Sequence, residues 1–130
     1  MNVSGEKTGK YKILIVEDNL ENAALMAEML EVACGHSVVW TKNGHLALKE
    51  VSEQDFDVIL MDIRMPEMSG FESSRQIRQL GYDMPIIAIT SDATCLGNKE
   101  LKNSGINSMV LKPFKFKQLE AAIEQAIGIN

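Results

Sequence analysis

Acidic, hydroxyl and basic side chains stand directly after short apolar runs at four places in this sequence. The adjacent acids Glu17 and Asp18 follow the first run, and a third acid, Asp62, follows a later one. Thr90 and Lys112 come after two further runs nearer the C-terminus. Carboxylates that converge repel one another unless a cation lies among them, and Mg²⁺ is the hard ion that prefers such oxygen ligands. With a lysine and a hydroxyl beside it, this set predicts a site for phosphoryl transfer.

These side chains meet only if the apolar runs are strands of one sheet. Short apolar runs alternate along the chain with longer segments in which apolar residues recur every three or four positions. The predicted strands cover residues 11–16, 37–41, 58–61, 85–89 and 106–111. The predicted helices cover residues 21–34, 46–51, 70–80, 94–103 and 117–127. This (βα)5 order predicts an α/β fold with a doubly wound, five-stranded parallel sheet, whose ligands bind at the carboxyl ends of the strands.

Length and charge limit the class of protein. The chain has 130 residues, enough for one domain, and 13 basic against 18 acidic residues give a formal charge of −5. No overall positive field would attract nucleic acid or an anionic membrane, and no apolar run approaches the ~20 residues of a membrane span. Residues 1–10 are polar and predict a flexible N-terminal segment without a secretory signal, ahead of a domain over residues 11–128. Cytoplasmic residence is the default expectation.

Four segments of the sequence then match a known pattern. They are residues 13–19 (ILIVEDN), 60–70 (LMDIRMPEMSG), 86–90 (IIAIT) and 111–114 (LKPF). In this order and on these elements they resemble the receiver domain of two-component response regulators. Asn19 after the acid pair and the strand sequence from Pro85 resemble those of receiver domains in hybrid sensor kinases. Whether the chain is free-standing or excised from a longer protein stays open.

The resemblance implies a fold, a reaction and a partner. The fold would be flavodoxin-like, with strand order 2-1-3-4-5. Asp62 would accept a phosphoryl group from a phosphohistidine on a histidine kinase or a histidine phosphotransfer domain, and the acquired group would switch the conformation. Lys112 would pair with the acyl phosphate, and Thr90 would turn inward to hydrogen-bond it. Such a domain would not be an enzyme acting on other substrates, because it would catalyse only its own phosphorylation and autodephosphorylation.

A magnesium site follows from the same resemblance. Asp18, Asp62 and the main-chain carbonyl of Arg64 would hold Mg²⁺, and Glu17 would act through a bound water. The resemblance also implies a cis peptide bond between Lys112 and Pro113, which is tolerable before proline.

Three other functions are weighed against this interpretation. Phosphatases that use an aspartyl nucleophile resemble a pattern with a second Asp two positions on, where this chain has Arg64. A receiver-like interaction module that is never phosphorylated stays open, although the acids, the threonine and the lysine are all present. Flavin binding would need amides and small hydroxyl residues after the first strand, where Glu17, Asp18 and Glu21 stand instead.

Four further residues carry expectations of their own. Met109 stands where the family commonly has a tyrosine or phenylalanine, which puts the aromatic switch of the family in doubt. Trp40 is expected to be a packing residue on the second strand. Arg64 lies two residues after Asp62, and Asp92 lies two residues after Thr90. Because both loops start at the same offset from a strand end, both side chains are expected to overhang the site. They would either pair with each other as a charged lid, or Arg64 would reach the phosphoryl oxygens directly.

Overall fold

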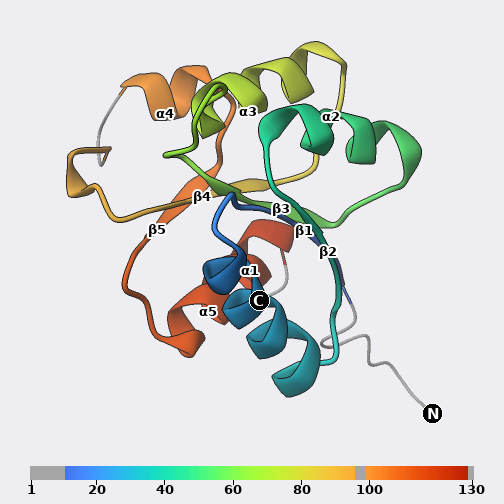
Figure 1. Cartoon of the computed structure of the whole chain (residues 1–130), viewed down its shortest axis with the longest axis vertical. Helices are drawn as coiled ribbons and strands as arrows, with labels where there is room; N and C mark the ends of the chain where they lie inside the picture. Colours follow the sequence, from blue (N-terminus) through green and yellow to red (C-terminus); the bar gives the residue numbers. More distant parts are fainter. Residues whose placement is uncertain (1–10, 96–98, 129–130) are drawn as a thin grey trace.

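Five parallel strands form one sheet in the computed structural model, which describes residues 11–95 and 99–128 (Figure 1). The strands are β1 (Lys12–Val16), β2 (Ser37–Thr41), β3 (Val58–Asp62), β4 (Ile86–Thr90) and β5 (Ser108–Leu111). Their order is β2-β1-β3-β4-β5, with every neighbouring pair parallel. The predicted fold class and strand order are confirmed. The expected flexible segment, residues 1–10, lies outside the described residues.

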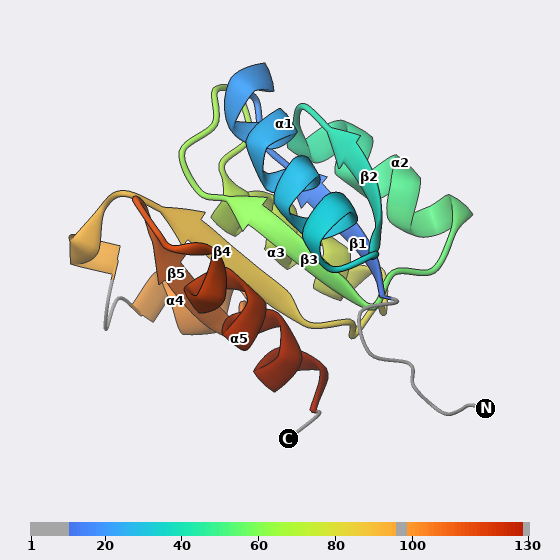
Figure 2. The same cartoon turned by 90° about the horizontal axis from the view of Figure 1, so that it is seen from below.

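Helices cover both faces of this sheet. They are α1 (Leu20–Glu28), continued by a π-helical turn (Met29–Ala33), then α2 (Gly44–Glu53), α3 (Gly70–Gln79), a 3₁₀ turn (Ala93–Cys95), α4 (Lys99–Asn103) and α5 (Phe116–Ile127). Figures 1 and 2 show α1 and α5 on one face and α2, α3 and α4 on the other. Within residues 11–95 and 99–128, no helix is long and apolar enough to cross a membrane.

Alternate residues of the central strands enter two separate cores. On β1, Ile13 and Ile15 pack with α1 and α5, whereas Leu14 and Val16 pack with α2 and α3. This alternation follows from the two-residue period of a strand. Every residue of β3 and β4 is buried, as expected of strands covered on both faces. Asp62 and Thr90, at the ends of these strands, therefore lie in rigid, well-packed surroundings.

Two helices depart from the predicted pattern. The first was predicted as one helix over residues 21–34, but after Glu28 it widens into a π-helical turn. The fourth was predicted over residues 94–103; among the described residues of this range, Lys99–Asn103 are α-helical, whereas Thr94 and Cys95 belong to a 3₁₀ turn. The side chain of Asp92 accepts hydrogen bonds from the N–H and hydroxyl of Thr94, which starts a tight 3₁₀ turn at this point instead of an α-helix.

The connection between β3 and α3 is shaped by close packing. Ser69 caps α3 by accepting a hydrogen bond from the N–H of Glu72. A Cβ atom on Gly70 would lie 2.4 Å from the backbone oxygen of Asp62, and the Gly70 N–H donates to the carbonyl of Ile63 at 3.0 Å. Glycine is thus required because the start of α3 lies directly against the end of β3. This contact fixes the backbone that carries Asp62.

Candidate functional site

The three predicted acids gather at the carboxyl edge of the sheet. Glu17 and Asp18 follow β1, Asp62 ends β3, and one carboxylate oxygen from each lies within 4.8 Å of the others. Glu17 and Asp62 are 1% and 5% exposed, whereas Asp18 is open to solvent. All the ligand atoms on offer are oxygens, which is the donor set of a hard divalent cation such as Mg²⁺. The residues present therefore fit the predicted metal.

The electrostatics of Asp62 point the same way. Burial, and then the negative charge of Glu17, raise the pKa of the Asp62 carboxyl to about 7, although Lys112 and the Arg64 N–H oppose that rise. One oxygen of Asp62 accepts a hydrogen bond from the Arg64 N–H at 3.2 Å. Without a cation, Asp62 therefore keeps its proton to a higher pH than an ordinary aspartate does, and a bound cation would favour its ionised, nucleophilic form.

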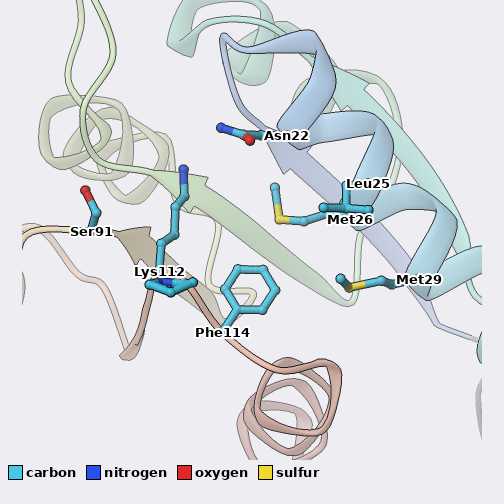
Figure 3. A pocket seen from close by; sticks show the side chains of 8 residues that line it. Asn22, Leu25, Met26, Met29, Ser91, Lys112 and Phe114 are labelled. Atoms are coloured by element: carbon cyan, nitrogen blue, oxygen red, sulfur yellow. The ribbon is translucent and has the colours of Figure 1, made fainter.

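Lys112 supplies the positive charge at this edge. Its Nζ lies 3.3 Å from Oε1 of Glu17, and its backbone N–H donates to the carbonyl of Thr90 at 2.8 Å. Figure 3 shows the lysine side chain extending toward the end of β3. The peptide bond between Lys112 and Pro113 is cis, as predicted. The lysine thus lies beside the acid cluster, with Glu17 as its ion-pair partner.

A polar network links Thr90 to the neighbouring loop. Thr90 is 1% exposed, and its hydroxyl oxygen accepts a hydrogen bond from the Asp92 N–H at 3.1 Å. The Asp92 carboxylate forms an ion pair with the guanidinium of Arg64, which is the paired arrangement of the two that the sequence left open. The loops after β3 and β4 are therefore tied together directly beside Asp62.

Trp40 contributes a contact that the sequence reasoning missed. It was expected to be a packing residue, but it is 39% exposed and its indole Nε1–H donates to the backbone carbonyl of Glu17 at 2.7 Å. The available signal was its position, because β2 is an edge strand and Trp40 precedes the strand's last residue.

An apolar groove borders the acid cluster. It encloses about 380 Å³ and is lined by Asn22, Leu25, Met26, Met29, Ser91, Lys112, Pro113 and Phe114 (Figure 3). Phe114 packs partly against the core, and its ring also faces α1 across the groove. Lys112 belongs both to this groove and to the acid cluster. A molecule bound in the groove would therefore lie against the site.

Known proteins are similar to this chain in sequence. The autoinducer 2 sensor kinase/phosphatase LuxQ of Vibrio vulnificus is 38% identical over 109 residues, which cover 83% of this chain and 13% of LuxQ. The transcriptional regulatory protein ZraR of Salmonella typhimurium is 31% identical over 120 residues, which cover 92% of this chain and 27% of ZraR. The chain thus spans a small part of these relatives, which include both a sensor kinase and a regulator.

A solved structure gives the same result. The receiver domain of the sensor histidine kinase PA1611 from Pseudomonas aeruginosa, with a magnesium ion coordinated in its active site cleft, superposes with a TM-score of 0.82 at 34% identity. The match covers 92% of this chain and 98% of that domain. The family of the response regulator receiver domain matches residues 13–124. The chain therefore belongs to the receiver domain family of two-component signalling.

Proposed function

We propose that this domain accepts a phosphoryl group on Asp62. The observation that carries the proposal is the convergence of Glu17, Asp18 and Asp62 within 4.8 Å, with the ammonium of Lys112 beside them. An Asp62 oxygen would attack the phosphorus of a phosphohistidine while the phosphorus–nitrogen bond breaks. The electron pair of that bond returns to the imidazole nitrogen, and the product is an acyl phosphate. The acquired charge then biases the conformation of the neighbouring loops.

Asp18 and Asp62 are the residues that would hold Mg²⁺. Glu17 would act through a bound water, and the main-chain carbonyl of Arg64 would complete the protein ligands. The all-oxygen donor set and the raised pKa of Asp62 support this assignment. The magnesium ion in the similar receiver domain of PA1611 supports it as well. When bound, the ion neutralises the negative charge that would otherwise repel the phosphoryl donor.

Lys112 and Thr90 would contact the transferred group. The Lys112 ammonium already lies 3.3 Å from a carboxylate of the cluster, so it can reach oxygens of a phosphoryl group on the adjacent Asp62. Thr90 is the last residue of β4, the strand beside β3. Its neighbour Ile89 is the register partner of Asp62, so the Thr90 hydroxyl lies near the end of β3. Both groups would stabilise charge that is spread over the three phosphoryl oxygens.

The phosphoryl donor would be a histidine kinase or a histidine phosphotransfer domain. A donor that brings a phosphohistidine to Asp62 must also cover the surface that borders the acid cluster. That surface includes the apolar groove, and on α1 the side chains of Leu20 and Leu25 remain 63% and 57% exposed. Apolar patches of this kind mark surfaces for protein partners. The location would be the cytoplasm, where such donors act.

Labelling with acetyl phosphate tests the proposal. With Mg²⁺ present, intact mass spectrometry should show one added phosphoryl group, and the group should be released by hydroxylamine. Without Mg²⁺, or in Asp62→Asn, the addition should disappear. A chain that stays unmodified while folded would instead be an interaction module, and continuous hydrolysis of the donor without a labile adduct would indicate a phosphatase.

A further inference from the structure

The one tryptophan of this chain occupies an unusual place. Trp40 lies on the edge strand β2 and is 39% exposed, and it belongs to neither of the two buried cores of the described chain. Its indole N–H nevertheless has a well-formed hydrogen bond, because it donates to the carbonyl oxygen of Glu17 at 2.7 Å. Smaller residues could continue the strand at this position, and phenylalanine could supply the same apolar ring. The feature that distinguishes tryptophan here is its N–H donor.

This hydrogen bond restrains the backbone between the two acids. The Glu17 carbonyl and the Asp18 amide belong to the same planar peptide unit, so fixing the carbonyl also fixes the start of Asp18. The preceding peptide is held as well, because the Glu17 N–H donates to the Thr41 carbonyl at 3.0 Å. The turn that presents both acids is therefore attached to β2 at two consecutive points, one through the backbone and one through the indole.

Such a restraint opposes the repulsion within the acid cluster. Ionised carboxylates whose oxygens lie within 4.8 Å of one another repel, and the Lys112 ammonium, 3.3 Å from Glu17, pairs with only one of the three. Asp62 is held at the end of a fully buried strand, whereas Asp18 is exposed on a turn. The turn that carries Asp18 is thus the part of the cluster that can move away from the other carboxylates. A restraint on its backbone keeps Asp18 near Asp62 before the metal arrives.

We propose that Trp40 is a positioning residue for the metal site, which preorganises Asp18 through the carbonyl of Glu17. This inference rests on the proposed function, because it concerns the Mg²⁺ affinity of the same cluster. Loss of the donor would oblige the ion to order the turn as it binds, and the cost would appear as weaker affinity. One hydrogen bond of ordinary strength corresponds to about a three- to tenfold change in the dissociation constant for Mg²⁺.

Two variants isolate the donor from the ring. Trp40→Phe retains an aromatic side chain without an N–H, and replacement of Trp40 by benzothienylalanine puts sulfur in place of the N–H in a ring of nearly the same shape. Because Trp40 is the one tryptophan, this analogue changes no other position. Val32→Ala, which truncates a side chain that is 78% exposed on the π-helical turn, is a matched control for the loss of surface apolar area.

Titration with MgCl₂ by nuclear magnetic resonance provides the readout. In the unmodified chain, the single indole N–H resonance should shift with the same midpoint as the backbone amides of the acid turn. Both Trp40 variants should bind Mg²⁺ about three- to tenfold more weakly than the unmodified chain and Val32→Ala. At saturating Mg²⁺, acetyl phosphate should label all four proteins at similar rates, because a metal-positioning defect disappears once the ion is bound.

The outcomes separate this inference from the function on which it rests. Equal Mg²⁺ affinity in all four proteins would overturn the role of Trp40 and leave the metal site intact. A labelling defect in the Trp40 variants that persists at saturating Mg²⁺ would also overturn it, because the residue would then be merely structural. If the unmodified chain itself binds no Mg²⁺, the proposed metal site fails, and the inference fails with it.

Discussion

Replacing Asp62 with asparagine should stabilise the fold in the absence of metal, and increasingly so as the pH rises. The pKa of this carboxyl is raised from 3.8 to about 7, chiefly by burial and then by Glu17. The folded protein therefore binds this proton more tightly than the unfolded chain does. Below pH 3.8 the carboxyl is protonated in both states, and it costs no stability through ionisation. As the pH rises from there to about 7, stability is lost, and above about 7 the loss is complete.

The size of the effect follows from the shift. A difference of about three pKa units corresponds to about 4 kcal/mol of unfolding free energy at full extent. Between pH 5 and pH 8 the change amounts to about 2 to 3 kcal/mol, since part of the loss has already occurred at pH 5. Asparagine has nearly the same shape and does not ionise in this range. The stability of Asp62→Asn minus that of the unmodified chain should therefore grow by this amount over the interval.

Urea unfolding in the presence of a chelator measures this difference. The two proteins are compared at pH 5, 6, 7 and 8, and contributions from titrating groups that do not interact with Asp62 cancel in the subtraction. Asp55→Asn, which removes an exposed carboxylate on the connection before β3, controls for the loss of one negative charge. Added Mg²⁺ should reverse the order at pH 8, because the ion stabilises the protein that retains Asp62. Parallel pH profiles for the unmodified chain and Asp62→Asn would refute the burial argument.

Three further predictions concern neighbouring residues. Arg64→Ala and Asp92→Ala should each shorten the lifetime of the phosphorylated form about three- to tenfold, with a non-additive double variant, if their ion pair shields the acyl phosphate from the hydrolytic water; unchanged decay of the adduct mass in all three would refute this. Thr90→Ala should still accept phosphate, but the chemical-shift changes on phosphorylation should shrink in the loop after β4, and a pattern like that of the unmodified chain would count against Thr90 as the coupling group. Gly70→Ala should lower the free energy of unfolding by about 1 to 3 kcal/mol in urea, since its Cβ would lie 2.4 Å from the Asp62 oxygen.

Much of the site was predictable because strand ends share an edge. Once the apolar runs are assigned to parallel strands, Asp18, Asp62 and Lys112 must meet at the carboxyl end of the sheet, whatever the details of the helices. The proximity of Arg64 and Asp92 was predictable for the same reason, because equal offsets from neighbouring strand ends bring two loops together, whereas their ion pair was one of two arrangements that the sequence left open. The position of each residue relative to the end of its strand thus determines where it lies in the site, and the apolar pattern of the sequence indicates where the strands end.

Contacts that depend on the exact distance between two packed elements could not be predicted from the sequence. The need for Gly70 arises from the distance between α3 and the end of β3, which no local pattern encodes. The indole bond of Trp40 arises because β2 lies beside β1 in a register that pairs Trp40 with Ile15. The π-helical turn after Glu28 replaces a helix whose apolar spacing looked continuous. Each of these features is set by tertiary packing rather than by the residues nearby.

Chemical mapping of the phosphorylated residue tests the central claim most directly. After labelling with acetyl phosphate and Mg²⁺, reduction by borohydride converts a phosphorylated aspartate into homoserine, and peptide sequencing by mass spectrometry locates it. The expected result is homoserine at position 62, with Glu17 and Asp18 unchanged. Reduction at Asp18, or the reduced alcohol of glutamate at Glu17, would contradict the assignment of Asp62 as the phosphoacceptor.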